Sequence, residues 1–182
     1  DVSLSPELDT FDCRNNRLAW LALQQDGFLD AVAAARARWG AQRVGVFLGT
    51  STSGILQTEL AYRRRDPVSG ALPADLHYAQ THNTYSVASY ARTVLGLAGP
   101  ACVVSTACSS SAKVFATAAR LIELDLIDAA VVGGVDSLCL TTLCGFHSLE
   151  LLAPDICRPW DADRVGLSIG EAAAFALLER EA

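Results

Sequence analysis

The chain has 182 residues, of which 51% are hydrophobic and 19% charged, with a formal net charge of −6 at pH 7. This length suffices for one domain with a sizeable core, and the negative charge argues against a nucleic-acid-binding domain, which is usually basic. Because no run of about 18 apolar residues is present, we expect no segment that spans a bilayer.

Cysteine and methionine usage indicates the environment of the protein. The 6 cysteines are irregularly spaced, with no CxxC pair and no zinc-type Cys/His cluster, so neither a disulfide framework nor a metal site is predicted. Residues 1–16 do not resemble a signal peptide, so we expect reduced thiols in a cytoplasmic protein. The 5 cysteines other than Cys108 are expected to be buried core residues. Methionine is absent even at position 1, and we therefore expect an internal piece or a processed product.

The first part of the chain predicts two helices followed by a buried strand. Apolar residues recur at helical spacing over 14–25 and again over 28–39, where Gly40 would end the second helix. Residues 43–48 are β-branched and apolar, as in a buried strand, and the small polar residues 50–54 predict a turn.

Two further helices are predicted on either side of a loop. The first covers 55–62, and the loop over 63–73 contains several arginines with Pro and Gly. The second covers 83–95, with Asn83 as its N-terminal cap and Gly96 at its end.

The remainder of the chain alternates apolar runs with helical patterns. Strands are predicted over 101–104, 128–135 and 171–179, helices over 112–126 and 141–152, and a loop over 154–164. Gly133-Gly134 inside the second of these strands predicts a close approach of backbone. Continuous apolar strands that alternate with helices predict an α/β layered fold with a covered sheet.

Cys108 lies in the segment Ser-Thr-Ala-Cys-Ser-Ser-Ser-Ala at 105–112, between a predicted strand and a predicted helix. A thiol at that turn faces the unpaired amides and the positive end of a helix, which favours the thiolate, the form that attacks carbon. Hydrolases place a nucleophilic serine on a similar strand–turn–helix elbow. The pattern therefore predicts a nucleophilic cysteine.

Four motifs occur in order along the chain. They are VVSTACSS at 103–110, DAAVVGGVD at 128–136, CRPWD with Arg164 and Gly166, and GEAAA at 170–174. In this combination the chain resembles the elongating β-ketoacyl-acyl-carrier-protein synthases, the thiolase-fold condensing enzymes of fatty acid and polyketide synthesis. Ala172 and Ala174 depart from the family, which has glycine at both positions.

The resemblance implies a thiolase-like layered α-β-α-β-α fold, with residues 1–182 forming part of the N-terminal ketosynthase domain. The implied activity is an acyltransferase reaction. An acyl chain on Cys108 undergoes decarboxylative Claisen condensation with malonyl-acyl carrier protein and gives 3-oxoacyl-carrier protein. The resemblance implies no metal and no organic cofactor. The family's two catalytic histidines belong to a C-terminal half, and His77, His82 and His147 match neither of them, so we expect residues 1–182 alone to be inactive in condensation.

The resemblance also implies roles for several other residues. The backbone N–H of Cys108 would be one donor of the oxyanion hole. Phe146 and Tyr78 would line the acyl pocket. The alternative for Phe146 is that it is an ordinary core aromatic residue. Arg14 and Arg17, three apart on one helix face, would dock the acidic acyl carrier protein, or would be a solvated face.

The family resemblance further implies a dimer, either of two copies or with another ketosynthase-like subunit, in which the strand at 101–106 pairs with its counterpart. Alternatives to an elongating ketosynthase are a non-catalytic chain-length-factor-like subunit, a thiolase acting on coenzyme A thioesters, and a cysteine hydrolase. The presence of Cys108 argues against the first, the signature at 158–166 against the second, and the lack of a visible resident base against the third.

Overall fold

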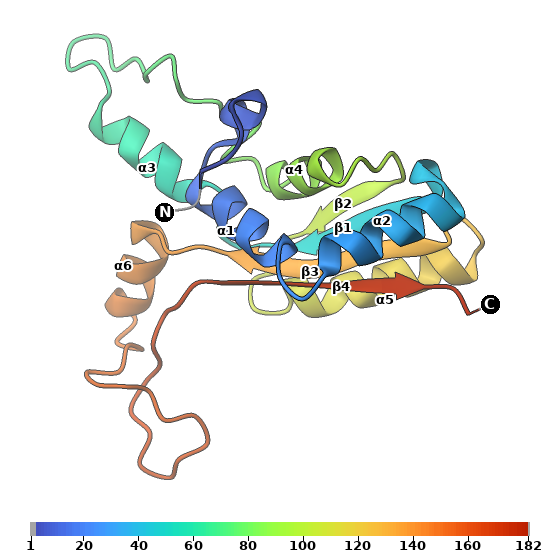
Figure 1. Cartoon of the computed structure of the whole chain (residues 1–182). Helices are drawn as coiled ribbons and strands as arrows, with labels where there is room; N and C mark the ends of the chain where they lie inside the picture. The colour runs from blue at the N-terminus through green and yellow to red at the C-terminus, as the bar shows by residue number, and fades with distance from the viewer. Residues whose placement is uncertain (1–2, 182) are drawn as a thin grey trace.

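Four strands form one sheet in the order β2-β1-β3-β4 in the computed structural model, which describes residues 3–181 (Figure 1). The strands are β1 (Val44–Gly49), β2 (Ala101–Val104), β3 (Ala129–Asp136) and β4 (Ala172–Glu179). β1 pairs in parallel with both β2 and β3, while β4 runs antiparallel to β3. The parallel strands β1, β2 and β3 therefore end at the same edge of the sheet.

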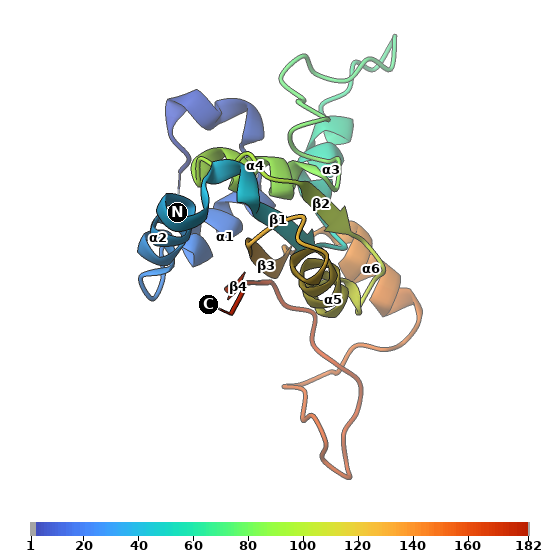
Figure 2. The same cartoon turned by 90° about the vertical axis from the view of Figure 1, so that its right-hand side faces the viewer.

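Helices cover both faces of this sheet (Figure 2). The helices are η1 (Pro6–Phe11), α1 (Arg14–Leu23), α2 (Phe28–Trp39), η2 (Ala41–Arg43), α3 (Ile55–Arg63), α4 (Ser86–Val94), α5 (Ser110–Glu123) and α6 (Leu140–Ser148). Helices α1, α2 and α4 lie on one face and α5 lies on the other (Figures 1 and 2). Within residues 3–181, no helix is both long enough and apolar enough to cross a membrane.

Alternation along the strands divides the core between the two faces. Val46 and Leu48 of β1 pack with the cluster under α1, α2 and α4, whereas Phe47 points to the opposite cluster with Val114 and Ala118 of α5. Every residue of β1 is buried, because the strand is central and both of its faces are covered. This explains why the parallel strands are apolar without a polar face.

An ion-pair network lies at the end of the sheet where β1 and β3 begin. Arg43 contacts Asp128 at 2.5 Å and Asp125 at 2.9 Å, and Arg180 contacts Asp125 at 2.5 Å and Asp128 at 3.3 Å. The hydrogen bond from Arg43 is the main cause that lowers the pKa of Asp128, and the hydrogen bond from Arg180 is the main cause that lowers the pKa of Asp125. The two aspartates before β3 thus connect Arg43, just before β1, with Arg180, just after β4.

Helices α3 and α6 extend beyond the sheet, at the end where the parallel strands finish (Figure 1). Glu59 of α3 accepts hydrogen bonds from the backbone N–H of Leu140 at 2.9 Å and of Thr141 at 2.7 Å, at the start of α6. Burial alone would raise the pKa of Glu59, but these bonds and one from the Thr141 hydroxyl lower it below its usual value. The carboxylate thus caps α6 from another helix.

The long segment between α6 and β4 projects away from the sheet (Figure 1). Trp160 in this segment is 98% exposed and Ile156 is 88% exposed. The predicted loop at 154–164 is confirmed.

The predicted α/β layered fold is confirmed, and three local predictions are corrected. Asn83 does not cap α4, because its Oδ1 accepts the N–H of Tyr85 in the turn before the helix, which begins at Ser86. The predicted helix at 141–152 ends at Ser148, after which the chain enters the projecting segment. The cysteines other than Cys108 are not all buried, because Cys144 is exposed on α6 and Cys102 and Cys157 are only half-buried.

Candidate active site

Three turns lie together at the edge of the sheet where β1, β2 and β3 end. They cover residues 50–54, 105–109 and 137–139, and each follows directly on one of the parallel strands. Ligands of open α/β sheets bind beyond the carboxyl ends of the strands, where such turns supply polar groups. The chemistry predicted for Cys108 is therefore at the edge where this class of fold builds its sites.

Cys108 occupies the turn between β2 and α5, as the strand–turn–helix pattern predicted, and its residue is exposed. Hydroxyl groups of the segment hold the turn. Ser110 Oγ accepts the N–H of Thr106 at 2.9 Å and donates to the carbonyl of Ala107 at 2.6 Å. Ser109 Oγ donates to the carbonyl of Thr106 at 3.0 Å. The serines around the cysteine therefore fix the backbone that carries it.

Two glycines allow the start of α5 to lie directly against the sheet. A Cβ at Gly49 would stand 2.5 Å from the backbone nitrogen of Ser111 and 2.7 Å from the carbonyl carbon of Ser110. A Cβ at Gly134 would overlap the Oγ of Ser111. The close approach of backbone predicted from Gly133-Gly134 is confirmed at Gly133, where a Cβ would stand 2.1 Å from the carbonyl oxygen of Ala174 on β4. At Gly134 the nearest atoms belong to the Ser111 side chain.

The first of the three turns is bound by a carboxylate that the sequence did not single out. Asp136, at the end of β3, accepts four hydrogen bonds on Oδ1. The donors are the N–H of Ser51 at 2.6 Å, the N–H of Thr52 at 3.0 Å, and the hydroxyls of Thr50 at 3.2 Å and Thr52 at 3.1 Å. The Thr-Ser-Thr-Ser run after a predicted strand was the available signal, but its acceptor comes from a strand about eighty residues later.

The other cysteines differ from Cys108 in their surroundings. Burial raises the pKa of the Cys13 thiol to about 11 and also raises the pKa of Cys102. Cys139 is buried, while Cys144 is exposed on α6. Among these thiols, Cys108 combines exposure with a position at the start of a helix.

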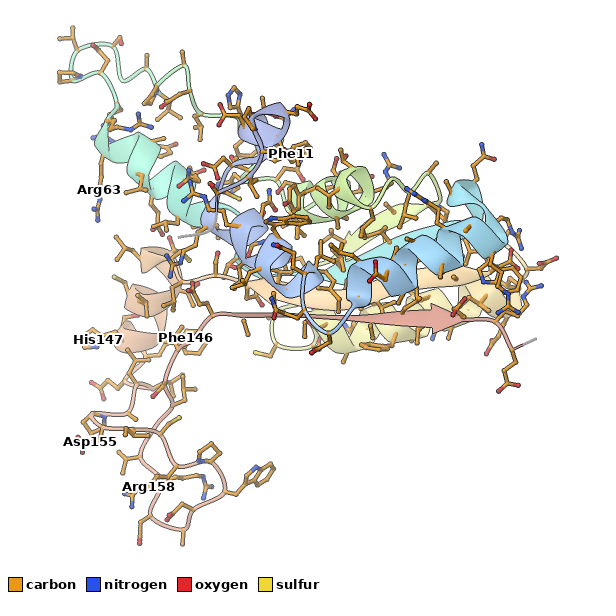
Figure 3. All side chains as sticks on the ribbon, in the orientation of Figure 1. Phe11, Arg63, Phe146, His147, Asp155 and Arg158 are labelled. Carbon is orange, nitrogen blue, oxygen red and sulfur yellow. The ribbon has the colours of Figure 1, made fainter. Side chains whose placement is uncertain are left out.

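Phe146 and Tyr78 lie on different elements. Phe146 is half-buried on α6, at the same end of the sheet as the Cys108 turn (Figure 3). Tyr78 is 55% exposed in the loop after α3 and stacks on His82, with ring centroids 4.9 Å apart. Among the hydrogen bonds and ring contacts of residues 3–181, none joins either aromatic side chain to the Cys108 turn.

Arg14 and Arg17 lie in the first turn of α1, and each is bound to a carboxylate. Arg14 Nε donates to Glu171 at 2.6 Å, and Arg17 is paired with Asp12. Glu171 also accepts the N–H of Leu138 at 3.1 Å, so Arg14 is linked to the turn that follows β3. About half of the Arg14 side chain remains exposed.

Comparison with known proteins identifies what the chain is similar to. The pattern of the family described as "Beta-ketoacyl synthase, N-terminal domain" matches residues 4–182. Nodulation protein E of Rhizobium leguminosarum bv. trifolii is 34% identical over 140 residues, which are 76% of this chain and 35% of that protein. Putative polyketide beta-ketoacyl synthase 1 of Streptomyces virginiae is 28% identical over 177 residues, 91% of this chain and 42% of that protein.

Among solved structures, too, the chain is similar to ketosynthases. The ketosynthase ApeO, solved in complex with its chain length factor ApeC from Xenorhabdus doucetiae, superposes with a TM-score of 0.85 and 36% identity. The superposition covers 100% of this chain and 45% of that chain. A beta-ketoacyl synthase from Burkholderia phymatum, at 23% identity and a TM-score of 0.83, shares the fold. The chain thus spans less than half the length of these relatives.

Proposed function

The chain belongs to the β-ketoacyl synthase family, within the N-terminal domain, and from this premise we propose that Cys108 is the acyl-accepting nucleophile of a ketosynthase. The observation that carries the proposal is the exposed thiol in the turn between β2 and α5, at the positive end of that helix. This is the setting in which proteins activate a cysteine for attack on a thioester.

In the proposed first step, the Cys108 thiolate attacks the thioester carbon of an acyl group carried on acyl carrier protein. A bond forms between Cys108 Sγ and the acyl carbon, the bond to the pantetheine sulfur breaks, and that sulfur takes up a proton. The backbone N–H of Cys108 is proposed to donate to the oxyanion of the tetrahedral intermediate. Loss of one such donor typically raises the barrier by about 3 kcal/mol.

In the proposed second step, the malonyl group on acyl carrier protein loses CO₂, and the resulting carbanion attacks the acyl carbon. The bond to Cys108 Sγ breaks, and 3-oxoacyl-carrier protein is released. The three histidines of the chain do not supply groups for this step in our proposal. His82 is engaged with the Thr58 hydroxyl at 2.6 Å, and His147 is exposed on α6. We therefore propose that residues 1–182 alone accept an acyl chain but do not complete the condensation.

The same premise supports proposals about partners. β2 is an edge strand without a charged residue, so we propose that it pairs with its counterpart in a second copy or in another ketosynthase-like subunit. Arg14 and Arg17 are proposed to dock the acidic carrier protein, with Phe146 and Tyr78 lining the acyl pocket.

All six cysteines are free thiols, which is consistent with the cytoplasmic location that we propose.

The experiment is acylation of the protein by an acyl-pantetheine thioester, with the modified residue located by mass spectrometry. We expect the acyl group on Cys108, no acylation of Cys108→Ala, and wild-type acylation of Cys144→Ala, the matched control at the exposed thiol on α6. Equal acylation of Cys108→Ala and wild type would overturn the proposal. Absence of acylation together with stable binding to a ketosynthase would instead favour a non-catalytic partner subunit.

A further inference from the structure

We infer that Ser51, itself held by Asp136, is a positioning residue that fixes the backbone orientation of the Cys108 turn. The inference rests on the proposed function, because it concerns the nucleophile of that reaction. It concerns the polar turn at residues 50–54, which has no role in the acyl-transfer steps above.

The residue before the nucleophile has an unfavourable backbone conformation. Ala107 has a φ of 54°, in the left-handed region that residues other than glycine rarely adopt. Such a conformation persists only where the surroundings hold it. The groups that bind the peptide of Ala107 therefore decide which way Cys108 is presented.

The carbonyl oxygen of Ala107 accepts hydrogen bonds from two hydroxyl groups on different segments. Ser110 Oγ, at the start of α5, donates at 2.6 Å, and Ser51 Oγ, from the turn after β1, donates at 3.2 Å. The first bond is internal to the cysteine turn and moves with it. The bond from Ser51 ties the turn to a separate part of the sheet and so can fix its position.

Ser51 can hold the cysteine turn only because its own turn is fixed. Oδ1 of Asp136 accepts hydrogen bonds from the backbone N–H groups of Ser51 and Thr52 and from the hydroxyls of two threonines. Ser137 donates two further hydrogen bonds to the same turn. Its N–H donates to Thr52 Oγ1 at 2.9 Å, and its Oγ donates to the carbonyl of Ser53 at 3.3 Å. The end of β3 therefore anchors the turn that follows β1.

The order of these contacts matches the order of the strands. Asp136 ends β3, Ser51 follows β1 and Ala107 follows β2, and in the sheet β1 lies between β3 and β2. A continuous series of hydrogen bonds thus crosses the strand ends and finishes one residue before Cys108. Hydroxyl and carboxylate groups with several partners each are suited to holding a turn in one arrangement.

The test compares Ser51→Ala with Ser51→Thr in the protein's full natural chain. The first variant removes the hydroxyl; the second keeps it, and its extra methyl has room because Ser51 is exposed. We expect Ser51→Ala to lower the maximal rate of Cys108 acylation by acyl-pantetheine about fivefold at unchanged KM, the effect of one neutral hydrogen bond. Ser51→Thr should restore the rate, and Asp136→Asn, which keeps Oδ1, should lose less than Asp136→Ala.

Ser69→Ala is the matched control. Like Ser51, Ser69 donates its backbone N–H to an aspartate, here Asp66, and its Oγ donates a further hydrogen bond, but both groups lie in an exposed loop turn. An unchanged rate for Ser51→Ala, or an equal loss in Ser51→Thr, would overturn the inference. Failure of the proposed function gives a different result, because the wild-type protein would then form no acyl-enzyme. In that event, iodoacetamide labelling of Cys108 relative to Cys144 decides the inference. A ratio that changes in Ser51→Ala supports it, and an unchanged ratio overturns it.

Discussion

Replacing Gly49 by alanine should disturb both the stability of the fold and the placement of Cys108, the proposed nucleophile. The added Cβ would stand 2.5 Å from the backbone nitrogen of Ser111, whereas contacts tighter than 3.4 Å already require a neighbour to give way. The first turn of α5 would have to retreat by about 0.9 Å, the difference between these two distances. Because the obstructing atoms belong to backbone, no side chain can rotate away.

Overpacking of this kind costs about 1–3 kcal/mol. For a chain of this length, about 2 kcal/mol corresponds to a fall in Tm of roughly 4–8 °C, which thermal unfolding followed by circular dichroism would measure. Acylation of Cys108 should also slow by up to about a hundredfold, because a displacement of about 1 Å misaligns reacting groups.

Gly145→Ala provides the control for this prediction. Gly145 lies in α6, and a Cβ there meets nothing within 4 Å. Alanine is favoured over glycine in a helix by about 1 kcal/mol, so the Tm should rise by a few degrees. A Tm of Gly49→Ala at or above that of the wild type would refute the argument that the helix start and the strand are in backbone contact.

Two further predictions concern charges. The pKa of Asp128 is held below its usual value by the hydrogen bond from Arg43, so the pair stabilises the fold above about pH 4 and loses this contribution as the pH falls through the lowered pKa. Urea unfolding of Asp128→Asn should therefore show reduced stability at neutral pH and a weaker loss of stability in acid; identical pH profiles would contradict this. Arg14→Glu should weaken binding of acyl carrier protein in a salt-dependent manner, measured by titration, whereas Arg38→Glu on α2 should not. Equal binding of carrier protein by both variants would argue against docking at Arg14.

Local patterns predicted most of the fold because they depend on neighbours in sequence. The strands predicted over 43–48 and 128–135 are present as Val44–Gly49 and Ala129–Asp136, each displaced by one residue. Their apolar runs were a sufficient signal, because a strand covered on both faces needs no polar alternation. The second helix, Phe28–Trp39, has the predicted bounds, and Gly40 with a φ of 87° ends it. The position of Cys108 between strand and helix followed from the same local signals.

The parts that sequence could not predict depend on contacts between distant segments. Asn83 was a reasonable cap by residue type, but its side chain binds the turn before α4 instead. The role of Asp136 was hidden because its partners lie about eighty residues earlier and are adjacent only once β1 and β3 pair. Likewise, only the structure shows that Arg14 is bound to Glu171.

Mutations at the two ends of the sheet should affect different properties of the protein. The network of Arg43, Asp125, Asp128 and Arg180 lies where β1 and β3 begin, on the far side of the buried strands from the Cys108 turn. Substitutions there can adjust tolerance of temperature or acidity without altering the groups around the thiol. Substitutions in the turns at the other end leave the register of the strands unchanged and act instead on the hydrogen bonds that hold the Cys108 turn. Mutations at one end can therefore change the stability of the fold, and mutations at the other end the surroundings of the thiol, independently of each other.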